Sequence, residues 1–308
     1  MLFNSIDFLC FFPVVVILYF CLPKRIQSLW LLATSYYFYM SWNAKYAALI
    51  LLSTLVTWLG GVLIAKWGRK KGIVILGTVI SLGILFYFKY INFAADILQQ
   101  VTDRIGIQLS IPEFDIILPV GISFFTFQTL GYLIDVYRGD TQTEYNFFRY
   151  ALFVSFFPQL VAGPIERSGH LLSQLKGCRR FDHDRFRQGL LMMIWGYFLK
   201  IVMADRIAVF VDSVYGDPVT FSGWYIAVAS ILFAIQIYCD FNGYSCIARG
   251  AACILGIDLV DNFNAPYLSE TVADFWRNWH ISLMSWFRDY LYIPLGGSKK
   301  RQSQKVHQ

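Results

Sequence analysis

The side chain best suited to chemistry in this sequence is a histidine set among aromatic and charged residues. His280 ends the run DFWRNWH (residues 274–280). A neutral imidazole accepts a proton near pH 7, so it can act as a general base that activates a hydroxyl group for acyl transfer. Arg277 and Asn278 stand nearby in sequence and could orient a substrate and polarise its carbonyl group. The competing interpretation is a structural histidine that bridges two helices or anchors the chain at the lipid headgroups.

The spacing around His280 predicts a helix. Residues three or four apart lie on one face of a helix, and that face would hold Trp276, His280, Leu283, Met284 and Phe287. Such a helix is too polar for an ordinary membrane span and too aromatic for an ordinary soluble helix. We therefore expect it to lie at the membrane boundary, with its rings at the level of the headgroups.

A second polar group stands between two apolar runs. Asp240 and Asn242 belong to the segment DFNGYS (residues 240–245), which we expect to break the helix there. Polar side chains are costly when they face lipid, so these two are expected to face the interior of a helix bundle. They could form a wall of the path for an acyl donor or acceptor, or they could cap helix ends at the break. The sequence leaves both interpretations open.

Composition places the chain in a membrane. Of its 308 residues 57% are hydrophobic and 15% are charged, whereas soluble domains carry roughly 25% charged residues. We therefore expect an all-α, polytopic bundle with re-entrant and interfacial helices in the lipid bilayer. The net charge of +6 does not indicate nucleic-acid binding, because the cations cluster in short loops between apolar runs. The six cysteines lack histidine or carboxylate partners at ligand spacing, so neither a metal site nor a bound cofactor is expected.

Apolar runs predict membrane-spanning helices, since a span needs about 20 apolar residues. The predicted spans cover residues 2–22, 26–42, 46–65, 73 to 88 or beyond, 119–136, 186–211 and 221–239, with a further run at 246–259. The basic loops 23–25 and 66–71 should both be cytoplasmic, which places the N-terminus outside. We expect one membrane domain over residues 1–297 and a basic polar tail over residues 298–308.

One run does not fit a simple span. Residues 147–161 are apolar but short, are interrupted by Pro158, and precede the basic stretch 166–187, which also holds His170 and His183. We interpret the run as a re-entrant segment on the cytoplasmic side, because irregular backbone at membrane depth must be buried in protein or line a water-filled cavity. The basic stretch could hold donor phosphates on the cytoplasmic face, although contact with anionic lipid explains it as simply.

Several motifs resemble one family. The segments LPVGISFFTFQ (118–128), FPQLVAGPI (157–165), DFNGYS (240–245) and RNWHISLMSWFRDYLYIPLGG (277–297) follow one another in its order. Together they resemble the membrane-bound O-acyltransferase (MBOAT) family, in the bacterial branch with alginate O-acetyltransferase AlgI and D-alanyl transferase DltB. The resemblance covers residues 1 to about 300. His280 falls on the first of the family's two signature polar positions.

The resemblance implies a function. A relative of this kind moves an acyl group, expected to be acetyl, from a cytoplasmic thioester such as acetyl-CoA to hydroxyl groups of an extracytoplasmic polysaccharide, as in alginate biosynthesis. It implies an extracytoplasmic acetyltransferase partner and a multi-pass place in the bacterial inner membrane. The family's second histidine lies in a later apolar helix that has no counterpart here, and His307 in the polar tail is no substitute. We therefore expect this chain to lack the catalytic C-terminal part.

Two alternatives remain open at this point. One is an inactive, truncated fragment, which the downstream genomic sequence would reveal. The other is a membrane transporter, since re-entrant segments and intramembrane polar residues occur in transporters too. Paired interrupted helices in two matching halves would favour the transporter, and the sequence shows none.

Overall fold

The protein is built from helices joined by short loops. The computed structural model describes residues 1–105, 118–160, 163–177 and 179–297. Within these ranges the only pairing of extended backbone is an isolated bridge between Phe263 and Trp279. This confirms the predicted all-α class. The tail 298–308 and most of the predicted external loop before residue 118 lie outside the described residues.

The first half of the chain forms long helices that follow the apolar runs. They are α1 (Ile6–Cys21), α2 (Lys24–Met40), the short turn η1 (Ala44–Tyr46), α3 (Ala47–Trp67), α4 (Lys71–Ile105) and α5 (Ile122–Arg138). Pro23 directly precedes α2, and Gly68, whose φ is 83°, directly follows α3. No proline interrupts the sequence of α4, and the helix continues beyond Phe88, as the predicted span of residues 73 to 88 or beyond allows.

The second half begins with short helices and continues with a long antiparallel pair. The short helices are α6 (Phe147–Ser155), α7 (Phe157–Leu160) and α8 (Ser168–Leu175). The pair consists of α9 (His183–Tyr197), the π-helical η2 (Phe198–Ala204) and α10 (Asp205–Gly216) on one side, and α11 (Gly223–Ile254) on the other. The chain closes with η3 (Pro266–Leu268), α12 (Val272–Asn278), α13 (Ile281–Phe287) and the π-helical η4 (Arg288–Tyr292).

The predicted helix break at residues 240–245 is wrong, because α11 runs through them without interruption. Two glycine pairs explain why a helix with small and polar residues is stable here. A Cβ atom on Gly196 would lie 2.6 Å from the carbonyl oxygen of Gly243, and one on Gly189 would lie 2.5 Å from that of Gly250. Small residues let two helix backbones approach this closely. Packing of α11 against α9 therefore compensates for the weak helix propensity of residues 240–245.

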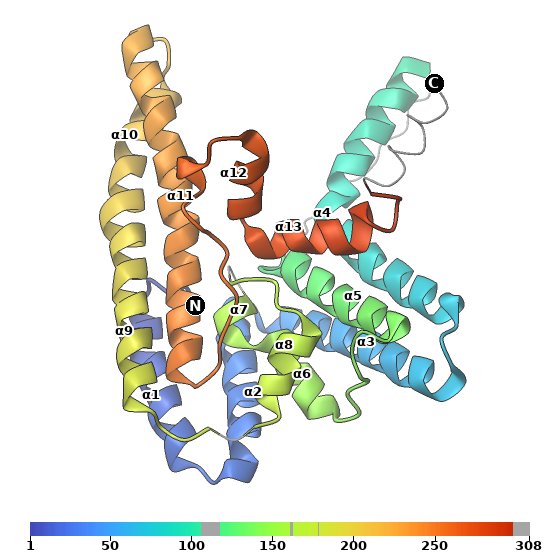
Figure 1. The fold of residues 1–308 in the computed structure, drawn as a ribbon. Helices are drawn as coiled ribbons and strands as arrows, with labels where there is room; N and C mark the ends of the chain where they lie inside the picture. The colour runs from blue at the N-terminus through green and yellow to red at the C-terminus, as the bar shows by residue number, and fades with distance from the viewer. Residues whose placement is uncertain (106–117, 161–162, 178, 298–308) are drawn as a thin grey trace.

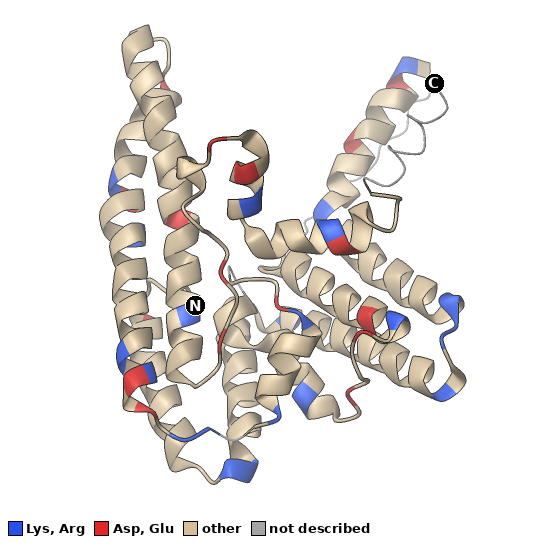
Figure 2. Cartoon of the chain, viewed as in Figure 1, with Lys and Arg blue, Asp and Glu red and all other residues tan. Residues whose placement is uncertain are grey.

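The helices fit a membrane protein. Three of the described helical stretches are long and apolar enough to cross a bilayer, namely Ala44–Trp67, Lys71–Ile105 and Gly223–Ile254. Figure 2 shows Lys and Arg at helix ends and in connecting loops, with few along the helix bodies. The predicted re-entrant run forms α6 and α7, and its residues from Tyr150 to Leu160 are buried in protein. Which side of the membrane this run enters from, and where the N-terminus lies, stay predictions.

The arrangement in Figure 1 places the C-terminal segment between two groups of helices. One group consists of α9, α10 and α11, and the other consists of α3, α4 and α5. Helices α12 and α13 lie between the two groups. The short helices α6, α7 and α8 lie beneath α12 and α13. The core between α1, α2 and α7 is aromatic and includes one ring from each helix, namely Phe8, Phe38 and Phe157. The fold therefore brings the α12–α13 junction, which contains His280, between these two groups of helices.

Candidate functional site

The helix predicted around His280 is broken at the histidine itself. Helix α12 ends at Asn278, and α13 begins at Ile281. His280 has φ of 45° and ψ of 54°, a left-handed conformation that is uncommon outside glycine and costs about 1–3 kcal/mol. The expected single face from Trp276 to Phe287 is therefore wrong, because the chain changes direction between these residues. Strain of this kind persists only where the surrounding structure fixes it.

The His280 side chain is enclosed by two aromatic rings from different helices. The Phe124 ring of α5 is stacked on the imidazole with centroids 6.1 Å apart, and the Phe241 ring of α11 meets it edge-on at 4.7 Å. His280 is 8% exposed, and its buried Nδ1 has no hydrogen-bond partner among the described residues. Burial lowers the pKa of the imidazole to about 4. The ring is therefore neutral at pH 7.

A hydrogen-bond chain from the preceding loop holds the His280 turn. The Asn262 backbone carbonyl accepts a bond from the Ile281 amide at 2.9 Å. The Asn262 side-chain oxygen accepts a bond from the Ser282 hydroxyl at 2.6 Å, and the Ser282 oxygen in turn accepts one from the Ile165 amide at 3.0 Å. Asn262 and Ser282 are 1% and 3% exposed. These buried bonds fix the start of α13 against the loop that leads into α8.

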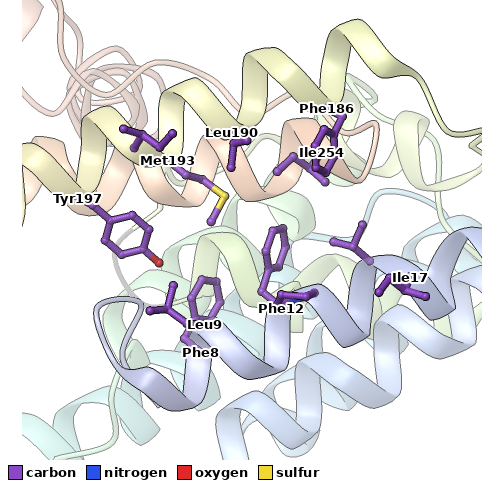
Figure 3. A pocket seen from close by; sticks show the side chains of 12 residues that line it. Phe8, Leu9, Phe12, Ile17, Phe186, Leu190, Met193, Tyr197 and Ile254 are labelled. Carbon is purple, nitrogen blue, oxygen red and sulfur yellow. The ribbon is translucent and has the colours of Figure 1, made fainter.

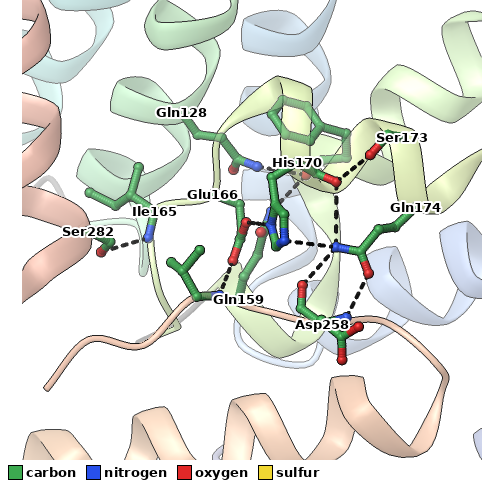
Figure 4. A network of polar contacts seen from close by, with 11 residues as sticks. Gln128, Gln159, Ile165, Glu166, His170, Ser173, Gln174, Asp258 and Ser282 are labelled. Atoms are coloured by element: carbon green, nitrogen blue, oxygen red, sulfur yellow. Dashed lines mark hydrogen bonds and ion pairs between the residues drawn. The ribbon is translucent and has the colours of Figure 1, made fainter. Parts of the chain in front are cut away.

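The buried carboxylate of Glu166, the residue after Ile165, extends this series of hydrogen bonds (Figure 4). The Glu166 side chain is fully buried, accepts a 2.6 Å bond from the Val260 amide, and lies 2.7 Å from Nδ1 of His170. The Gln174 side chain bonds both the amide and the carbonyl of Asp258 at 2.8 Å. Helix α8 thus holds the loop that carries Asn262, and this loop holds the His280 turn.

The far end of α13 is tied to α5. The Trp286 indole nitrogen donates to the Phe127 carbonyl at 2.9 Å, and the Tyr290 hydroxyl donates to the Asp135 carboxylate at 2.6 Å. The Arg167 guanidinium pairs with Asp289 at 2.8 Å and lies over the Tyr290 ring. Asp135 is 8% exposed, so its bond to Tyr290 is buried. His280 is therefore fixed from both directions along the chain.

The sequence is similar to known proteins. The family model of MBOAT, the membrane-bound O-acyltransferase family, matches residues 140–308, which include the loop, the His280 turn and α13. The chain belongs to the MBOAT family. The resemblance expected from its motifs is confirmed.

Curated relatives cover the chain from end to end. It is 40% identical over 306 residues to a Pseudomonas aeruginosa protein named "probable alginate O-acetylase AlgI", an alignment that covers 97% of this chain and 58% of that protein. It is 32% identical over 337 residues to a peptidoglycan O-acetyltransferase of Helicobacter pylori, covering 98% of this chain and 63% of that enzyme. A teichoic acid D-alanyltransferase of Bacillus subtilis is 27% identical over 193 residues, 59% of this chain and 47% of that enzyme. The chain thus spans about three fifths of the AlgI relatives.

The other predicted site residues of this MBOAT protein point elsewhere. Arg277 pairs with Asp274 at 2.7 Å, and its side chain is 76% exposed. The Asn278 side chain donates to the Asp274 carbonyl at 3.0 Å and to the Ser269 hydroxyl at 3.3 Å. The structure gives both residues partners within α12 and the segment before it, and their predicted role at His280 stays a prediction.

The two polar residues of α11 likewise have helix partners. Asp240 pairs with Lys200 of η2 at 2.7 Å, and Lys200 also pairs with Asp205 at 2.9 Å. Asn242 donates to the Tyr238 hydroxyl at 3.1 Å. Phe241 between them contacts the imidazole, so this stretch of α11 does border the site. Whether it forms a wall of a substrate path stays a prediction.

Sequence reasoning missed the residues that build the turn. Asn262, Ser282 and Glu166 lie 18, 2 and 114 positions from His280, counted as differences in residue number, and only the fold brings them together. His170, whose ring is half-exposed, belongs to this set through its bond to Glu166. The one usable signal was Glu166 directly after the Gly-Pro-Ile end of an apolar run, since a carboxylate there needs a partner.

Three polar clefts lie next to one another near α5, α8 and η4. They have volumes of about 210, 430 and 500 Å³, and all three are lined in part by Thr141. Their linings include four cationic and four acidic side chains, namely Arg69, Arg138, Arg167, Lys176, Asp135, Asp140, Glu144 and Asp289. Arg179 lies elsewhere, where its amide and carbonyl bond Gln27 of α2.

Proposed function

We propose that the protein is a membrane O-acyltransferase that moves an acetyl group from a cytoplasmic thioester to hydroxyl groups of an extracytoplasmic polysaccharide. The observation that carries the proposal is His280, which lies in the MBOAT signature and is held neutral, buried and unpaired in a strained turn. The names of the relatives support the acceptor class: alginate, peptidoglycan and teichoic acid are all polymers with hydroxyl groups.

The chemistry required of such a site is simple to state. The acceptor oxygen attacks the thioester carbonyl, the new C–O ester bond forms, and the C–S bond breaks to release the thiol. The proton leaves the attacking hydroxyl for a base and finally reaches the departing sulfur. A neutral imidazole within about 3 Å of the hydroxyl can accept that proton. In this proposal His280 supplies a proton-accepting nitrogen at the first signature position of the family, and Phe124 and Phe241 keep bulk water away from it.

The polar clefts around Thr141 support a donor that carries phosphates, such as acetyl-CoA. Arg138 and Lys176 offer cationic groups there, and phosphate oxygens form strong charge-assisted hydrogen bonds with such groups. The clefts border α8 and η4, the two elements that anchor the His280 turn. In the proposal, the donor enters on this side, the membrane is the bacterial inner membrane, and an extracytoplasmic acetyltransferase receives the acyl group.

The test uses the protein expressed from its complete reading frame in inner-membrane vesicles. Labelled acetyl-CoA is supplied on the cytoplasmic side, and label in polysaccharide or on the partner is counted. His280→Ala should lower transfer about 100-fold or more, which is typical for loss of a general base. The control His183→Ala removes an exposed histidine at the start of α9 and should leave transfer unchanged. Equal turnover by His280→Ala and the wild type would refute the role of His280.

A further inference from the structure

The surface between α1 and α9 is hollowed. A groove of about 510 Å³ runs between these helices and is closed at its base by Ile254 of α11 (Figure 3). Of the 12 side chains that line it, only Tyr197 carries an oxygen or nitrogen atom. The Tyr197 hydroxyl is already used, because it donates to the Phe3 carbonyl at 2.8 Å. The lining of the groove is therefore almost entirely apolar.

The groove has a buried floor and exposed rims. Phe8 and Met193 in the floor are 0% and 5% exposed, whereas Leu9 and Ile17 on the α1 rim are 54% and 62% exposed. Its length follows from the helix rise of about 1.5 Å per residue, which gives roughly 14 Å between Phe8 and Ile17. The hydrocarbon core of a bilayer is about 30 Å thick, so one leaflet is about half of that. An acyl chain of one leaflet matches the groove in both polarity and length.

Basic residues gather at one end of the groove. The two helices run antiparallel, so the C-terminus of α1 and the N-terminus of α9 lie together, where the Phe20 and Phe181 rings meet at 5.4 Å. Gln27 exchanges two 3.3 Å hydrogen bonds with the Arg179 backbone, which brings the segment before α9 against the start of α2. Three exposed arginines lie at this end: Arg25 at the start of α2, Arg180 in the segment before α9, and Arg187 in the first turns of α9.

Two exposed acidic side chains, Asp182 and Asp184, lie at the same end, and the three arginines outnumber them. Asp182 caps α9, because its carboxylate accepts bonds from the Asp184 and Arg185 amides at 2.9 and 3.1 Å. A phosphate is the anion that arginine binds best in bidentate geometry. An apolar groove one leaflet long, with arginines at the headgroup end, has the layout of a phospholipid site.

We propose that this groove holds one phospholipid, with an acyl chain along α1 and α9 and an anionic headgroup on Arg25, Arg180 and Arg187. The lipid fills a gap between two helices that otherwise touch mainly through α2 and α11. The positive-inside rule assigns it to the cytoplasmic leaflet. The proposal does not depend on the acyltransferase activity.

The first test is lipid retention. The complete protein is purified in mild detergent, and bound phospholipid is counted by native mass spectrometry. The wild type should retain about one phospholipid per chain. Leu190→Trp fills the groove from α9 and should reduce retention at least threefold, while the matched control Leu191→Trp, an exposed neighbour outside the groove, should not. Ile17→Trp fills the groove from α1, so a folding defect in one variant leaves the other to decide.

The second test concerns the headgroup. Nanodiscs that contain equal amounts of phosphatidylglycerol and phosphatidylethanolamine supply the lipid. The wild type should be enriched at least threefold in phosphatidylglycerol, and the variant Arg25→Gln/Arg180→Gln/Arg187→Gln should lose that enrichment. A wild type without retained lipid, as would follow if another part of the protein covers the groove, overturns the proposal. So does retention that Leu190→Trp and Ile17→Trp both leave unchanged, or equal headgroup ratios in wild type and triple variant.

Discussion

In the α9–α11 pair the two backbones touch at glycines, whereas in the α12–α13 turn the backbone is strained and side chains hold it. Gly189 and Gly196 face Gly250 and Gly243 with no room for a Cβ atom. The His280 turn instead depends on Asn262 and on the polar partners behind it. The first region gains rigidity from close packing in an apolar solvent. The second maintains an unusual geometry at one functional group, and it does so with buried hydrogen bonds.

The largest effect should come from opening the helix pair. Gly196→Leu places a side chain where the Gly243 carbonyl oxygen lies 2.6 Å from an ideal Cβ, and backbone cannot yield as a side chain can. We expect loss of the monodisperse, detergent-extracted protein in fluorescence-detected gel filtration. Gly83→Leu on α4 is the matched control, because nothing lies within 4 Å of its Cβ position. A normal elution profile for Gly196→Leu would mean that the two helices do not pack as described.

A smaller effect should follow when the turn loses its support. Asn262→Ala removes the acceptor for Ser282 and leaves the fold of the helices intact, so we expect at least a 10-fold fall in acetyl transfer with an unchanged elution profile. The comparison variant is Asn264→Ala, which changes an exposed asparagine of the same loop. If Asn262→Ala transfers acetyl at the wild-type rate, the loop does not position His280.

The Glu166–His170 pair should give a pH-dependent effect on stability. The pKa of His170 is raised, first by its hydrogen bond to Glu166, in a helix that is not a membrane span. A raised pKa in the folded state adds stability below the unfolded value of about 6.5, and this stability is lost as pH rises through the folded pKa. Wild type should therefore melt a few degrees above His170→Gln at pH 6, and the difference should shrink by pH 9. A constant difference from pH 6 to 9 would show that the pair carries no charge-dependent stability.

The smallest effect is expected at Arg277. Its side chain is 76% exposed and paired with Asp274, and exposed ion pairs contribute roughly 0–1 kcal/mol. Arg277→Ala should therefore change acetyl transfer by less than twofold in the vesicle assay. A loss comparable to that of His280→Ala would restore the role at His280 that sequence proximity suggested, and it would place a substrate on the exposed side of α12.

The helices could be predicted from the sequence because hydrocarbon runs of sufficient length have few alternatives in a membrane. The α12–α13 turn could not, since the spacings of four and seven between Trp276, His280 and Phe287 fit a continuous helix equally well. The interruption depends on Asn262, which lies 18 positions before His280 and bonds the Ile281 amide. The continuity of α11 was missed for the converse reason. Polar Asp240 and small Gly243 argue locally for a break, and their partners Lys200 and Gly196 are on another helix.

The central claim is that the loop and α8 act on transfer through the geometry of His280. The direct measurement is a double-mutant cycle on acetyl transfer with wild type, Asn262→Ala, His280→Ala and the double variant. Residues that act as a unit are not additive. The account predicts that Asn262→Ala lowers the wild-type rate at least 10-fold but leaves the residual rate of His280→Ala unchanged. A full further 10-fold loss in the double variant would contradict it, because Asn262 would then act independently of His280.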